Sequence, residues 1–139
     1  MELRKFIERT AATGILGVKI TQNGEDMGKH LWDEECRRNI YSASKSFTSA
    51  AVGIAVKEGL LRLEERLVDA FSEDIPENPN EFLQQATVRD LLTMCLGQQN
   101  AELMGGQRPF YQQKDWVRMS LAFPFTECPG KRFLYNNVG

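Results

Sequence analysis

The segment spanning residues 42–58 constrains the fold more than any other part of the chain, because as a helix it would be apolar on nearly every side. A helix of that kind is buried rather than lying on the surface. Several of its side chains are small, which permits close packing against a neighbour, and Gly59 is a natural C-terminal stop. We therefore predict a buried helix from Ser42 to Glu58. Its apolar residues are Phe47, Ala50, Ala51, Val52, Ile54, Ala55 and Val56.

The residues before this helix predict a shorter helix and a pair of strands. Apolar residues recur at helical spacing within residues 2–12, with charges between them, which is typical of a short amphipathic helix. Residues 14–32 contain two extended runs separated by Asn23-Gly24, a strong hairpin signal.

The residues after the buried helix are predicted to be mainly helical. Leu63–Phe71 indicates a short helical turn, and Lys114–Ala122 indicates another helix. Thr87–Met94 begins with Thr87 and has Asp90 three residues later, a variant of the capping box that starts many helices. We interpret the chain as one domain or part of one. Residues 1–41 hold a helix and a sheet hairpin, and residues 42–139 hold the helical region.

Composition narrows the function classes. The chain has 139 residues, 42% of them hydrophobic, which is enough for a packed core. Its 17 basic and 19 acidic residues give a formal charge of −2, which argues against a nucleic-acid partner. It has no apolar run of the roughly 20 residues that span a bilayer, so no membrane partner is expected. The charged N-terminus lacks the apolar stretch of a signal peptide, which predicts a cytoplasmic location.

The cysteine and histidine content also narrows the chemistry. Cys36, Cys95 and Cys128 form no CxxC pair and are expected to be reduced thiols rather than a disulfide framework. His30 is the single histidine. The sequence therefore does not favour a zinc site, which often uses several histidine ligands, or a Ser-His-Asp triad. We expect no metal site.

The sharpest chemical feature is Ser42-Ala43-Ser44-Lys45, an S-x-x-K at the start of the predicted buried helix. Residues three apart share a helix face, so the Lys45 amine can lie near the Ser42 hydroxyl. A serine becomes a good nucleophile when a neighbouring base takes its proton. A lysine amine is that base only when uncharged, and both burial and a helix N-terminus disfavour the ammonium. The Ser42 backbone N–H is also a candidate oxyanion donor.

A second feature is Tyr135-Asn136-Asn137, a Y-x-N near the end of the chain. A phenol beside an ammonium can shuttle protons, and an amide two residues later can hold a substrate carbonyl or the lysine. Each motif alone also has a plain structural interpretation. Ser42 would then be a helix cap with Lys45 extended to solvent, and Tyr135 would lie in an ordinary turn.

Taken together, these segments resemble the serine β-lactamase and penicillin-binding-protein superfamily, most closely its branch of class C β-lactamases, DD-peptidases and esterases. The segments that carry the resemblance occur in the family's order and at similar separations. They are Tyr41–Ser49 with its S-x-x-K, Thr87–Thr93, and Pro129–Gly139 with its Y-x-N. In β-lactamases and penicillin-binding proteins, S-x-x-K occurs with companion motifs, and the identity of the acylation base is disputed.

The resemblance implies a fold and a set of roles. The fold is the α+β sandwich of β-lactamases and transpeptidases. Ser42 would be the acylated nucleophile, Lys45 its activating partner and Tyr135 a proton relay. Asn137 would bind the substrate amide and orient Lys45. The implied substrate is a small molecule with an amide, ester or β-lactam carbonyl, and no cofactor is implied.

The sequence also departs from the family pattern. The family's third motif, on a strand that supplies the second oxyanion donor, would lie beyond Gly139. Loss of one such donor costs on the order of 10²–10³ in rate in related acyl-transfer chemistry. We therefore interpret the chain as an incomplete, N-terminal part of such a hydrolase, whose activity alone is in doubt. Because a two-stranded hairpin leaves an open edge, a second chain or another copy is expected to cover it.

Two other interpretations remain open at this point. One is a non-catalytic binding or interaction protein on the same scaffold, which would give no covalent adduct at Ser42. The other is an unrelated helical module in which S-x-x-K is only a cap, so that Lys45→Met would leave all properties unchanged.

Overall fold

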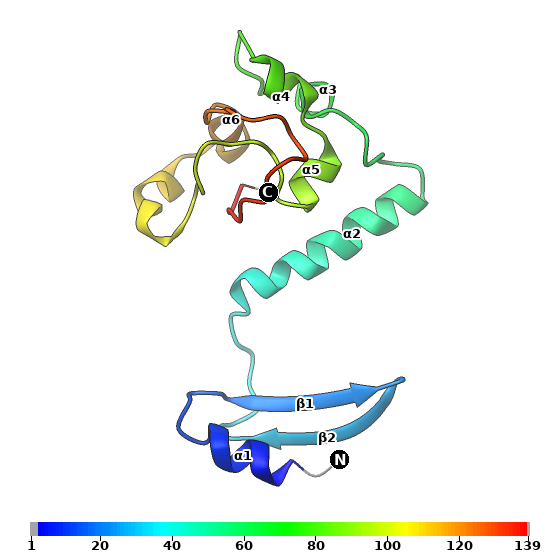
Figure 1. The fold of residues 1–139 in the computed structure, drawn as a ribbon, viewed down its shortest axis with the longest axis vertical. Coiled ribbons are helices and arrows are strands. Elements are labelled where there is room, and N and C mark those ends of the chain that lie inside the picture. Colours follow the sequence, from blue (N-terminus) through cyan, green and yellow to red (C-terminus); the bar gives the residue numbers. More distant parts are fainter. Residues whose placement is uncertain (1–2, 139) are drawn as a thin grey trace. The chain divides into compact units, whose positions relative to one another are not determined.

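The computed structural model describes residues 3–138, and the chain divides between Tyr41 and Ser42 into two compact units. Both helices and strands are present, so the predicted α+β class is confirmed (Figure 1). Across residues 3–138 the longest helix has 13 residues, too few to cross a bilayer.

The first unit consists of helix α1 (Arg4–Thr10) and the antiparallel strands β1 (Gly17–Gln22) and β2 (Glu25–Leu31). Gln22 pairs with Glu25 across the turn, and Asn23 and Gly24 both have positive φ, 52° and 83°. These angles suit the tight turn that matches the twist of a hairpin. The predicted hairpin is therefore confirmed.

The 3₁₀ turn η1 (Tyr41–Ser44) spans the division between the units. The second unit continues with helices α2 (Lys45–Lys57), α3 (Leu67–Ala70), α4 (Glu81–Gln85), α5 (Val88–Leu92) and α6 (Trp116–Leu121). Further 3₁₀ turns, η2 (Gly105–Gln112), are interrupted at Gln107. The apolar core of this unit comes from α3 to α6 and the segments between them (Figure 1). Its buried members are Leu67, Leu83, Ala86, Val88, Leu96, Leu121 and Phe125.

The prediction that residues 42–58 form a buried helix is wrong in two respects. The α-helix begins at Lys45, because residues 41–44 form the 3₁₀ turn, and no residue of α2 is buried. Phe47 is 71% exposed and Ile54 is 58% exposed, whereas Val52 packs against the core. An apolar sequence pattern indicates how much surface a helix could bury, but burial also requires a surface to pack against it. Among the described residues, only one side of α2 packs against other parts of the unit.

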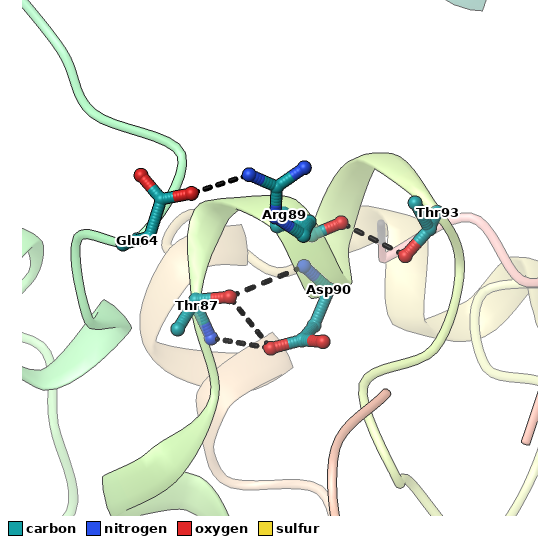
Figure 2. Close-up of polar contacts among 5 residues, drawn as sticks. All are labelled: Glu64, Thr87, Arg89, Asp90 and Thr93. Carbon is teal, nitrogen blue, oxygen red and sulfur yellow. Dashed lines mark hydrogen bonds and ion pairs between the residues drawn. The ribbon is translucent and has the colours of Figure 1, made fainter. Parts of the chain in front are cut away.

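The start of α5 is fixed by a reciprocal pair of hydrogen bonds, which Figure 2 shows. The Thr87 backbone N–H donates to Asp90 Oδ2 at 2.9 Å, and the Thr87 hydroxyl oxygen accepts from the Asp90 backbone N–H at 3.4 Å. The predicted capping box is therefore confirmed. Arg89, in the first turn of α5, forms an ion pair with Glu64 on a neighbouring segment. Together these contacts fix the helix that faces the S-x-x-K segment.

Candidate active site

Ser42 lies in the 3₁₀ turn that leads into α2. Tyr41, directly before it, has φ of 46°, a left-handed conformation that is strained for a residue with a side chain. The Tyr41 backbone N–H donates to Asn39 Oδ1 at 2.8 Å, a local turn that helps hold this conformation. Lys45, three residues after Ser42, is the first residue of α2.

Lys45 joins the two motifs. Its Nζ donates to Asn137 Oδ1 at 3.1 Å, across 92 residues of sequence. The same Nζ lies 5.7 Å from the centroid of the Tyr135 ring, within the range of a cation–π contact. Lys45 is half-buried although it belongs to an exposed helix. The ammonium thus lies between a phenol ring and an amide oxygen, both supplied by the Y-x-N segment.

Backbone hydrogen bonds place the Y-x-N segment. The Leu134 N–H donates to the carbonyl oxygen of Met94 at 2.9 Å, and the Asn137 N–H donates to that of Glu102 at 3.1 Å. Met94 has φ of 56°, so the chain turns sharply directly after α5. The segment that follows α5 therefore sets the position of Tyr135 and Asn137.

The Asn137 side chain is fixed by a second contact. Its Nδ2 donates to the carbonyl oxygen of Leu103 at 2.7 Å, which leaves Oδ1 to face Lys45. Leu103 is 2% exposed and has φ of 55°, an uncommon conformation for a leucine. Among the described residues, the second N–H of the amide has no partner. That donor is available to a carbonyl group.

Sequence reasoning missed a buried pair of amides behind the site. Asn136 Nδ2 donates to Gln98 Oε1 at 3.2 Å, and Gln98 Nε2 donates to the carbonyl oxygen of Ser120 at 3.1 Å. Asn136 is 2% exposed and Gln98 is 1% exposed. The position of Asn136 between Tyr135 and Asn137 could have predicted its burial. Successive side chains of an extended segment point to opposite sides, so a residue between two that face the site points away from it.

The structure therefore brings together three of the four predicted site residues, Lys45, Tyr135 and Asn137. The Ser42 side chain is exposed and makes no hydrogen bond to any described residue. Lys45 also lines a hollow of about 250 Å³ between the start of α2 and the end of α5. The other lining residues are Ser44, Thr48, Ser49, Leu91, Leu92 and Met94.

The arrangement brings together an amine, a phenol and an amide, and the exposed Ser42 lies three residues before the lysine in the chain. Within residues 3–138, no group of three or more His, Cys, Asp or Glu side chains could hold a metal ion. The residues at hand can supply a nucleophile, proton transfer and a carbonyl-binding donor.

The sequence model of the beta-lactamase family matches residues 3–139. No curated protein matches the chain in sequence.

Proposed function

Because the chain belongs to the beta-lactamase family, as its family match over residues 3–139 shows, we propose that it is a serine hydrolase that forms an acyl-enzyme at Ser42. The family resemblance seen in the sequence is confirmed by that match. Membership supports a hydrolase; the roles of individual residues are the proposal.

One observation supports these roles above the others. Lys45 Nζ lies 3.1 Å from Asn137 Oδ1 and 5.7 Å from the Tyr135 ring centroid. If Ser42 were only a helix cap, Lys45 would extend into water, where its ammonium is best solvated. Here the ammonium instead meets two side chains of the second motif.

In the proposed reaction, Lys45 acts in its uncharged amine form. The Ser42 hydroxyl oxygen attacks the substrate carbonyl carbon, and the Lys45 amine takes the hydroxyl proton. The bond between the carbonyl carbon and its leaving group then breaks, and the leaving group takes a proton relayed through Tyr135. Water then attacks the carbonyl carbon of the resulting Ser42 ester and gives up a proton to the same relay. The bond between that carbon and Ser42 Oγ breaks, Oγ takes the proton back from the relay, and the carboxylic acid leaves. Each step transfers a proton between groups near the reacting atoms, which is the usual arrangement for acyl transfer.

We place Asn137 at the substrate rather than at a reacting atom. Its unpartnered N–H would donate to a carbonyl of the substrate, and its Oδ1 would hold Lys45 in position. The substrate class is an amide, ester or β-lactam carbonyl.

The test is covalent labelling followed by mass spectrometry. We expect a fluorophosphonate or a fluorescent penicillin to add one adduct to the chain, on the peptide that contains Ser42. Ser42→Ala should abolish the adduct. Ser46→Ala, an exposed serine one turn further along, should keep it.

Lys45→Met distinguishes a serine activated by Lys45 from a serine that reacts without help from the lysine. It should slow labelling by 10²-fold or more, because removing a general base typically costs that much. The proposal is overturned if the folded chain gives no adduct with either reagent, or if Ser42→Ala is labelled as fast as the wild type.

A further inference from the structure

An apolar cavity lies in the second unit, lined by residues of α3, α5 and α6 and by the end of the Y-x-N segment. Its volume is about 210 Å³. Ser120 and Asn137 are its only polar lining residues among those the structure describes. The apolar lining comes from Leu67, Phe71, Leu91, Leu103, Trp116, Val117, Leu121 and Val138.

The size and lining of the cavity favour an apolar occupant over water. An engineered apolar cavity of roughly 150 Å³ stays dry and takes up benzene, because a buried water needs two to four polar partners. The cavity beside Asn137 is larger and offers two polar side chains. A phenyl ring or a chain of about six carbons fits this volume.

The cavity is accessible and borders the proposed site. Trp116 and Val117, at the start of α6, are 44% and 41% exposed, so the lining reaches the molecular surface. Asn137 lines the cavity and also accepts the hydrogen bond from Lys45. Leu91 lines both this cavity and the hollow that contains Lys45. The apolar cavity and the hollow beside Lys45 therefore share Leu91 as a lining residue.

We propose that this cavity, which we call the Trp116 pocket, receives an apolar group of the carbonyl substrate, with the free N–H of Asn137 bound to a carbonyl oxygen near that group. This inference rests on the proposed function and adds a substrate class. The preferred substrate carries a phenyl-sized or roughly six-carbon apolar substituent, rather than a small or charged one.

Binding can be measured without any turnover. The chain has two tryptophans, so a Trp32→Phe background leaves Trp116 as the fluorescent reporter in the pocket wall. We expect hexanamide to change this fluorescence saturably and acetamide to bind on the order of 100-fold more weakly. Each buried methylene contributes about threefold to fourfold.

Two variants test the location. Ser120→Phe fills the pocket and should reduce hexanamide affinity at least tenfold, whereas Ser72→Phe adds the same ring at an exposed serine outside it and should not. Val117→Asp places a charge in the pocket wall at a half-exposed position, and should weaken binding even if Ser120→Phe proves unstable. Far-ultraviolet circular dichroism checks that each variant is folded.

Labelling of Ser42 then separates the two proposals. Acylation by p-nitrophenyl hexanoate should be faster than by the acetate in the wild type, and this preference should disappear in Ser120→Phe. Hexanamide binding without any Ser42 adduct would overturn the hydrolase but leave the pocket. Ser42 acylation with no chain-length preference and no hexanamide binding would overturn the pocket alone.

Discussion

The Asn137 side-chain amide donates to the backbone carbonyl oxygen of Leu103 at 2.7 Å, and this bond decides which end of the amide meets Lys45. A carbonyl oxygen can only accept, so the nitrogen of Asn137 must face Leu103 and the oxygen must face the ammonium. The contact to Lys45 therefore depends on an unusual backbone conformation at Leu103, where φ is 55°.

Asn137→Asp should slow acylation at neutral pH. A carboxylate in place of the amide would put a negative charge about 3 Å from Lys45 Nζ, and an opposite charge at that distance stabilises the ammonium over the free amine. It would also lose the N–H bond to Leu103. We expect the fluorophosphonate labelling rate at pH 7 to fall roughly 10-fold or more.

The control for this variant is Asn100→Asp, which introduces the same charge at an exposed loop residue. Its labelling rate should stay within about twofold of the wild type. Equal rates for wild type and Asn137→Asp across pH 6–10 would contradict the role given to the contact with Lys45.

Gln98 and Gln99 are adjacent residues with opposite environments, which makes them a matched pair. Gln98→Leu removes the hydrogen bonds that the Gln98 side chain makes with the Asn136 amide and with the Ser120 carbonyl oxygen. A hydrogen bond contributes about 0.5–1.5 kcal/mol, so losing two should lower the free energy of unfolding by about 2 kcal/mol. Gln99→Leu, at an exposed position, should change it by less than about 0.5 kcal/mol. Urea denaturation measures both. Similar midpoints for the two variants would mean that the amide pair contributes little.

Gly97 lies where the chain after α5 approaches the segment before the Y-x-N. Its φ is 79°, and a Cβ there would lie 2.1 Å from the carbonyl oxygen of Glu127, a backbone atom. The Thr126 and Glu127 N–H groups both donate to the Gly97 carbonyl oxygen, so neither backbone can easily move away. We expect Gly97→Ala to cost about 3 kcal/mol or more.

Gly59→Ala isolates the conformational part of that cost. Gly59 also has positive φ, 73°, but a Cβ there would meet no atom within 4 Å. Its substitution should cost about 1–2 kcal/mol, the usual penalty of a left-handed residue with a side chain. If the two alanine variants have equal urea midpoints, the close approach at Gly97 is not a source of stability.

Features set by neighbouring residues could be predicted from the sequence. Asn23-Gly24 predicted the hairpin because the turn needs two residues that tolerate positive φ. Thr87 and Asp90 predicted the start of α5 because a capping box acts within one turn. In both cases the determining atoms lie within four residues of one another.

Features set by distant contacts could not be predicted in this way. The pairing of Asn136 with Gln98 joins residues 38 apart, and no local pattern identifies the partner. The exposure of α2 depends on which surface packs against it. Its composition shows only that the helix could be buried, not whether it is. The meeting of Lys45 with Asn137 was implied by the family resemblance, because spacing alone says nothing about residues 92 apart.

Glu64 and Arg89 predict a dependence of stability on pH. The hydrogen bond from Arg89, together with a backbone hydrogen bond, holds the pKa of the Glu64 carboxyl below its ordinary value (Figure 2). A depressed pKa in the folded state stabilises the protein above the unfolded pKa, roughly 4.3, and that contribution is lost as the pH falls through the lower, folded value. Glu64→Gln removes it at every pH. The wild type should therefore be more stable than Glu64→Gln at pH 7, and the difference in urea midpoint should close towards pH 3.

The control is Glu77→Gln, at an exposed glutamate that forms no ion pair with any described residue. Its difference from the wild type should not change in this way with pH. A gap that stays constant from pH 7 to pH 3 would show that the Arg89 contact does not couple Glu64 ionisation to folding.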